Sequence, residues 1–179
     1  ELLVAAIMIG MAACAAPDPI PGGPGRLIDV LLTPASLGKN LTLSQMVVGE
    51  FEDQKHSFHV EVEVMPARMA VVGLTPVGLP LFTLEQAEDE IFVETLGVEQ
   101  FPFDPRHMLF NIQIAHWPEA ALREKYEEHG LVLRAPANQK MREVLDGAGT
   151  LVVIVTYTGA DKTGQDVLIE HFEPPYRLY

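Results

Sequence analysis

Residues 56–64 alternate between apolar and polar side chains with a period of two, which is the pattern of a half-buried β-strand. One side of the segment is wholly apolar and the other carries Ser, His and Glu, so one face should meet a core and the other water. Such a strand needs antiparallel partners and an apolar layer over its core face. The apolar side consists of Phe58, Val60, Val62 and Val64.

Further apolar runs predict the partner strands, in two series separated by a helical segment. Within each series no helix separates the runs, and this predicts antiparallel pairing in meanders. The first series contains residues 41–51, 56–64, 69–74, 79–84 and 91–96, and the second contains 131–134, 140–145, 150–158, 167–172 and 176–179.

The segment between the two series predicts two helices. Asp104-Pro105 is a good helix start, because Asp satisfies free N–H groups and Pro suits the first helical position. Residues 106–117 have two apolar stripes at helical spacing, so this helix should be covered on two sides. Pro118 breaks it, and residues 119–129 form a second, charged helix before the C-terminal cap Gly130. The stripes are Met108, Leu109, Ile112 and Ala115, and Phe110, Ile114 and Trp117.

This order of elements predicts a mainly β (α+β) fold: a curved antiparallel sheet, or open half-barrel, with two helices on its concave face. Helices that fill the concave face only in part leave an apolar cavity. Taken singly, each candidate lining residue is better explained as ordinary core, and the cavity is inferred from the architecture as a whole. The candidate lining residues are Phe58, Val60, Val62, Met108, Phe110, Ile112, Ile114 and Trp117.

The charge of the chain argues against several classes of partner. With a formal net charge of −13 the protein should not bind nucleic acid, because it has no excess of positive charge to neutralise phosphates. The same sign argues against adsorption to anionic lipid by charge alone. Hydrophobic residues make up 48% of the chain and charged residues 21%, which is typical of a globular protein.

The reactive side chains favour a protein that is not an enzyme and holds no metal or cofactor. None of its serines stands in a Gly-x-Ser-x-Gly elbow. His56 and His59 should face opposite sides of a strand, and the spacing of His107 and His116 does not bring them together on a helix.

Cys14, the single cysteine, follows a short apolar run and precedes a Pro- and Gly-rich stretch. Residues 2–13 are too few to span a bilayer and have the length of the apolar region of a signal peptide. The small residues before Cys14 resemble the lipobox of bacterial lipoproteins, which implies acylation of this cysteine. Acyl chains hold a protein at a membrane without a basic patch. The alternative is a buried N-terminal helix with a free core cysteine.

The resemblance to lipoproteins also predicts a division of the chain. Residues 1–13 would be a signal peptide, residues 14–26 the lipidated cysteine with a Pro/Gly tether, and residues 27–179 the folded domain. Ala15 stands where an aspartate is the usual signal for retention in the inner membrane, so the resemblance implies the outer membrane.

Motifs in the domain resemble a known family. Val72-Gly73-Leu74-Thr75-Pro76-Val77-Gly78, followed by Leu81-Phe82-Thr83-Leu84, resembles a strand–loop–strand of the LolB lipoprotein receptors, whose loop reads Asn-Pro-Leu-Gly. A LolB-like family of outer-membrane lipoproteins of unknown function is a closer match. Its genes often lie in aryl polyene and related biosynthesis clusters. It shares the loop, the helix from Phe103-Asp104-Pro105 to Trp117-Pro118, and the final Tyr176-Arg177-Leu178. The resemblance covers residues 41–179.

The LolB resemblance implies a role for the loop in membrane insertion. In those receptors the loop leucine protrudes and helps to insert acyl chains into the membrane. Val77 stands at the position of that leucine, and Thr75 stands at the position of the Asn. Leu74 and Leu79 are further candidates for the protruding side chain. The alternative is a tight turn with Val77 tucked in.

The resemblance implies a LolA/LolB-like, lipid-handling protein that faces the periplasm of a Gram-negative bacterium. It would bind an acyl-bearing cargo, either a lipoprotein or an aryl polyene or glycolipid, and pass it on. Its implied partners are membrane lipid through acylated Cys14, the cargo and a periplasmic LolA-like carrier, and we expect a monomer. The alternative is a non-transporting structural or assembly lipoprotein of an envelope biosynthesis system, whose helices fill the sheet.

Overall fold

The structure is a computed structural model that describes residues 27–51, 54–96, 104, 106–137, 140–158, 166–172 and 175–179. The first meander contains β1 (Leu41–Phe51), β2 (Gln54–Met65), β3 (Arg68–Leu74), β4 (Pro80–Ala87) and β5 (Glu90–Thr95). The second contains β6 (Val132–Arg134), β7 (Met141–Leu145), β8 (Leu151–Thr158), β9 (Asp166–Phe172) and β10 (Pro175–Leu178). The helices are the 3-10 helices η1 (Leu27–Val30) and η2 (Pro34–Leu37) and the α-helices α1 (His107–His116) and α2 (Glu119–Glu128).

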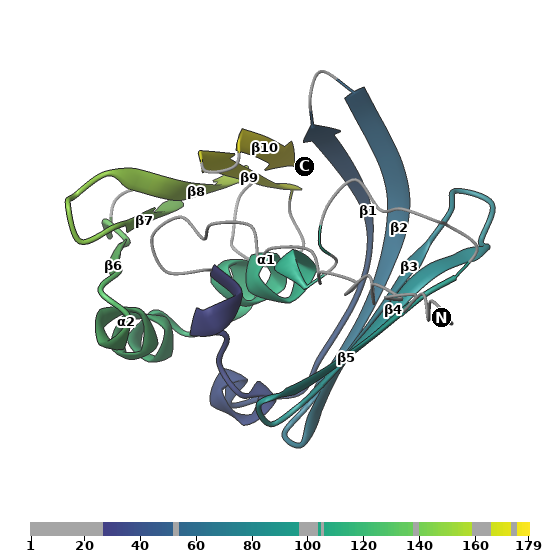
Figure 1. The fold of residues 1–179 in the computed structure, drawn as a ribbon, viewed down its shortest axis with the longest axis horizontal. Coiled ribbons are helices and arrows are strands. Elements are labelled where there is room, and N and C mark those ends of the chain that lie inside the picture. Colours follow the sequence, from purple (N-terminus) through teal and green to yellow (C-terminus); the bar gives the residue numbers. More distant parts are fainter. Residues whose placement is uncertain are drawn as a thin grey trace, which may run out of the picture.

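All the described strands belong to one antiparallel sheet in the order β5-β4-β3-β2-β1-β10-β9-β8-β7-β6. Each meander keeps its sequence order, and the first strand of the first meander pairs with the last strand of the second. The sheet curves without closing, and α1 lies on its concave side while α2 lies beside β6 (Figure 1). The predicted fold class, a mainly β half-barrel with helices, is therefore confirmed.

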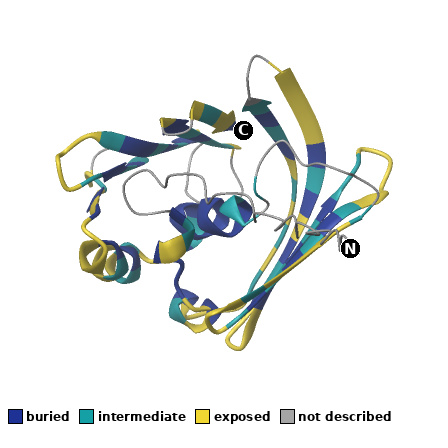
Figure 2. Ribbon diagram, viewed as in Figure 1, coloured by how far each residue is buried: buried dark blue, intermediate teal, exposed yellow. Residues whose placement is uncertain are grey.

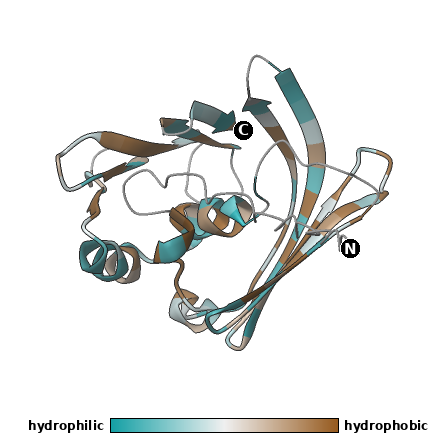
Figure 3. Ribbon diagram, viewed as in Figure 1, coloured by the Kyte–Doolittle hydropathy of each residue, from teal (hydrophilic) through white to brown (hydrophobic). Residues whose placement is uncertain are grey.

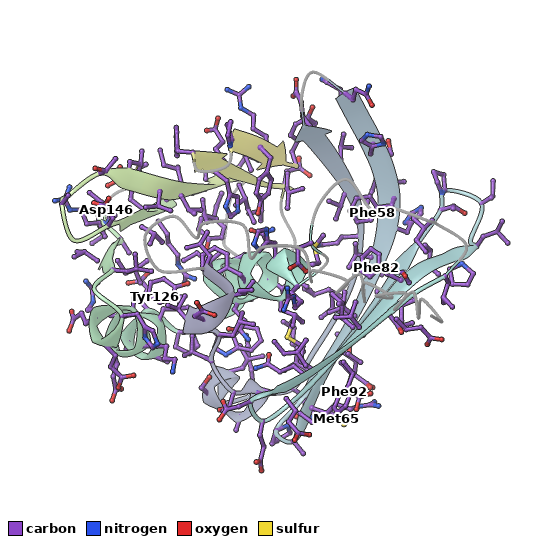
Figure 4. All side chains as sticks on the ribbon, in the orientation of Figure 1. Phe58, Met65, Phe82, Phe92, Tyr126 and Asp146 are labelled. Carbon is purple, nitrogen blue, oxygen red and sulfur yellow. The ribbon has the colours of Figure 1, made fainter. Side chains whose placement is uncertain are left out.

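The predicted alternation decides which face of the sheet is buried. Along β2 the side chains from Phe58 to Val64 alternate between buried and more exposed positions, and β3 and β4 continue the same pattern. On the concave side Phe58 and Phe82 meet edge to face, with ring centroids 6.2 Å apart (Figure 4). The core therefore lies between this inner face and α1, which is buried along nearly its whole length (Figure 2).

The predicted helix pair is confirmed, with small shifts at its ends. Trp117 and Pro118 adopt extended backbone conformations between α1 and α2. Gly130 follows α2 with a φ of +72°, and its N–H donates to the carbonyl of Glu127, as expected of a C-terminal cap. The side chain of Asp104 accepts a hydrogen bond from the backbone N–H of Arg106 at 3.0 Å. Arg106 directly precedes the first residue of α1. Pro105 lies outside the described residues.

No helix among the described residues has the length and apolar character needed to cross a membrane. The surface of α2 is charged, whereas α1 is largely hydrophobic (Figure 3).

Gly73 on β3 provides a test of the packing on the inner face. A Cβ atom at this position would lie 2.2 Å from Cε1 of Phe82, a buried ring on the neighbouring strand. We therefore expect Gly73→Ala to lower the free energy of unfolding by about 1–3 kcal/mol, the usual cost of overpacking. Urea denaturation measures it.

Gly49→Ala is the matched control, since its Cβ would meet Leu178 at an ordinary 3.5 Å. If both alanine variants have the stability of the parent protein, the described contact between Gly73 and Phe82 is wrong.

Candidate functional site

The two halves of the sheet join over a short contact that we call the seam. The seam consists of the register pairs Gly49↔Leu178 and Glu50↔Arg177, together with two backbone bonds between Val48 and Tyr179. On its other side β1 pairs with β2 along its full length. Among the described residues, residues 41–47 of β1 therefore pair with β2 on one edge and have no paired strand on the other edge, toward β9.

A cavity of about 370 Å³ lies next to the seam, between β1, α1 and β9. This volume is at the lower end of the range for small-molecule sites. We call this space the inner cavity. Its apolar walls come from all three elements and include Leu43, Val47, Met108, Ile112, Val167 and Ile169.

His116 is a polar group in the wall of the inner cavity. Burial lowers its pKa to about 4, and the positive charges of Arg142 and Lys39 act in the same direction. The imidazole is consequently neutral at pH 7, which suits a cavity for uncharged groups.

A second buried histidine lies behind the cavity wall. Nε2 of His171 donates to Oδ1 of Asn111 at 2.7 Å, because that oxygen only accepts, and Asn111 donates to the hydroxyl of Tyr176 at 3.4 Å. The rings of His171 and Tyr176 stack with centroids 3.9 Å apart. Burial lowers the pKa of His171 to about 3, assisted by the nearby His107, and burial raises the pKa of Tyr176. Asn111 also lines the cavity, so this cluster supports its wall.

The last turn of α1 is held by side chains from the second meander. The guanidinium of Arg142 donates to the carbonyl of Ile114, and the hydroxyl of Tyr157 donates to the carbonyl of Ala115 at 2.8 Å. A cation at this helix end is favourable because the free carbonyls carry partial negative charge. These bonds fix the end of α1 that presents His116 to the cavity.

Two buried glutamines hold the opposite side of α1. Gln113 accepts a bond from the backbone N–H of Leu32 at 2.8 Å and donates to the carbonyl of the same residue at 2.9 Å. It also donates to Gln86 of β4, which in turn donates to the carbonyl of Leu32. The chain between η1 and η2 is thereby tied to both the helix and the first meander.

The candidate cavity residues fall into two groups. Met108 and Ile112 line the inner cavity. The other six are buried in the core without lining it, and Trp117 donates its indole N–H to Ser36 at 2.9 Å. Their predicted contact with cargo stays a prediction. The six are Phe58, Val60, Val62, Phe110, Ile114 and Trp117.

Sequence reasoning missed the walls that β1 and β9 contribute. Leu43 and Val47 lie in the predicted strand 41–51, and Val167 and Ile169 lie in the predicted strand 167–172, so each pair had a strand signal. Nothing local in the sequence indicated that these two strands would stand opposite each other beyond the seam.

The candidate insertion loop is a tight turn that connects β3 to β4. The N–H of Gly78 donates to the carbonyl of Thr75, and the N–H of Leu79 donates to the hydroxyl of Thr75. Val77 is 82% exposed and Leu79 62% exposed, whereas Leu74 is half-buried. Two apolar side chains therefore project from the turn, and Val77 is not tucked into it.

The described residues contain no group of three or more metal-binding side chains. The side chain of Ser36 accepts a hydrogen bond from Trp117, and that of Ser44 donates one to Glu61 at 2.6 Å.

Cys14 lies outside the described residues, so its predicted acylation stays a prediction.

A family model described as "Protein of unknown function (DUF3261)" matches residues 42–179, which run from β1 to beyond β10. No curated protein matches the chain.

The buried histidines predict a stability that depends on pH. The folded state holds His171 and His116 at pKa values of about 3 and about 4, below the ordinary value of 6.5. Unfolded chains therefore bind more protons between these values, so stability is fully present above pH 6.5 and falls as the pH is lowered. At pH 5 the loss should be about 2 kcal/mol per histidine. Urea denaturation at pH 7.5 and pH 5 measures it.

His171→Gln keeps a donor for Asn111 and should reduce the difference in stability between pH 7.5 and pH 5. The control is His56→Gln, at an exposed position on β2, which should leave the difference unchanged. An equal pH dependence in the parent and in His171→Gln would contradict the neutral, buried histidine.

Proposed function

The chain belongs to the DUF3261 family, whose function is unknown, and we propose that it is a carrier that binds an acyl chain in the inner cavity and passes its cargo on. The observation that carries this proposal is the cavity itself. It is walled mainly by apolar side chains from β1, α1 and β9, and burial keeps His116 neutral in its wall. Removing an acyl chain from water contributes about 25 cal/mol per Å² of apolar area.

The place of action follows from the sequence. We propose that acylated Cys14 anchors the protein in the outer membrane of a Gram-negative bacterium, with the domain in the periplasm. A LolA-like carrier would deliver the cargo, which is a lipoprotein, an aryl polyene lipid or another acyl product. The exposed Val77 and Leu79 support a role of their loop in release, because apolar side chains at a turn can enter a lipid surface.

A structural or assembly role is the second candidate, and one observation favours it. Helix α1 lies on the concave face, and Phe110, Ile114 and the following Trp117 are almost completely buried. A sheet filled by its own helix needs no cargo to complete its core. The two candidates differ in whether the inner cavity takes up a ligand.

Native mass spectrometry of the full chain carrying Cys14→Ala, recovered without detergent, tests the carrier proposal. We expect a co-purifying lipid or uptake of added palmitate. Leu43→Trp should weaken palmitate binding by more than about tenfold, because the indole occupies the cavity volume that the chain would take.

Thr42→Trp is the matched control, since Thr42 is the preceding residue on β1 and is exposed on the opposite face. Its binding should equal that of the parent. An apo mass together with no uptake of palmitate or of an acylated peptide would sink the carrier proposal and leave the structural role.

The loop has its own test. Val77→Asp should leave palmitate binding unchanged but slow the transfer of bound palmitate to phospholipid vesicles by about tenfold, because burying a valine contributes about 1.5 kcal/mol or more. Val132→Asp, at another exposed valine on β6, is the control for added charge. Transfer at the same rate in both variants would remove the loop from the mechanism.

A further inference from the structure

A second cavity, of about 390 Å³, lies on the other side of the sheet, at the same end of β9. We call it the outer cavity. The inner and outer cavities share Asp166, Val167 and Tyr179 in their walls. These residues lie at the start of β9 and directly after β10, where the seam ends. The two cavities are thus adjacent beside the seam, on opposite faces of one sheet, with these three residues between them.

The strand register explains why the cavities differ in chemistry. Val167 and Ile169 pair with the buried Tyr157 and Val155 and face α1. Glu170 is on the opposite face of β9, where it pairs with Arg177 of β10. The inner cavity is consequently walled mainly by apolar side chains, while the outer cavity carries most of the charged ones.

The charges of the outer cavity are mainly negative. Its wall contains three carboxylates, those of Glu50, Asp166 and Glu170, and one guanidinium. That guanidinium, of Arg177, already pairs with Glu170 at 2.9 Å. The ammonium of Lys55 does not line the cavity and already has partners, Glu50 at 4.0 Å and the ring of Tyr179 at 5.5 Å. The net charge of the whole chain, −13, has the same sign as the charge of this wall.

We propose that the two cavities form one site for a single-chain amphiphile, with the tail in the inner cavity and the head group in the outer cavity beside the seam. The head group is neutral or carries an amine, because an anion would meet the carboxylates without a free cation in the described wall to offset them. This inference rests on the proposed carrier function and deepens it, since it names the class of cargo head group.

Binding of glycerol monolaurate and laurate to the full chain carrying Cys14→Ala tests the inference. The two ligands have the same acyl chain, and only laurate is negatively charged at pH 8. Glycerol monolaurate should bind about tenfold more tightly than laurate. This ratio corresponds to the repulsion between two like charges about 12 Å apart at an effective dielectric constant of about 20. Displacement of a fluorescent fatty-acid probe measures both affinities.

The double variant Asp166→Asn/Glu170→Gln should reduce this preference severalfold at low salt. Its matched control is Asp89→Asn/Glu128→Gln, which makes the same change of net charge at exposed residues outside both cavities. Glu128, like Glu170, has a basic partner, Lys125 at 4.0 Å. The control should keep the preference of the parent.

The outcomes separate the two proposals. If both ligands bind the parent with equal affinity, or if the site variant keeps the full preference, the head group does not lie in the outer cavity and the inference fails while the carrier function stands. If neither ligand binds, both the inference and the carrier function fail.

Discussion

The burial of α1 is the constraint on which the rest of the structure depends. A helix enclosed by protein has no water to satisfy its polar groups, so each of them needs a partner from another element. Gln113 finds one between the 3-10 helices and β4, Asn111 finds one on β9, and the last carbonyls find theirs on β7 and β8. These bonds come from both meanders. The helix therefore fixes the distance between the two halves of the sheet, whose described strands pair with each other at the seam.

The candidate site follows from this arrangement. Because α1 holds the halves apart, β1 and β9 diverge from the seam, and the space between them is walled by whatever these strands and the helix present. Inward positions of a half-buried strand are apolar and outward positions are polar. A site that passes beside the end of β10 therefore changes from apolar to charged across the thickness of one sheet.

The sequence predicted the elements well, because their signals are local. The period of two in β2, the break at Pro118 and the cap at Gly130 each depend on neighbouring residues, and the observed bounds lie within a few residues of the expected ones. The position of the cavity could not be predicted, because it depends on where β10 ends relative to β1, a contact between the two ends of the domain. The partners of Gln113 are equally remote, since Leu32 lies 81 residues away. From the sequence, a polar residue such as Gln113 between two apolar stripes indicated only that its side chain needed a hydrogen-bond partner.

The pairing of β1 with β10 also determines the order in which the protein can fold. The first meander is synthesised complete with its turns, and until α1 has been made its apolar inner face has only the segment of η1 and η2 to pack against. The seam has to wait for the final residues, so the most non-local contact of the sheet forms last. Topologies of this kind fold slowly, and their intermediates expose hydrophobic surface to other chains. The half-barrel is thus most prone to aggregation in the interval between its fifth strand and its first α-helix.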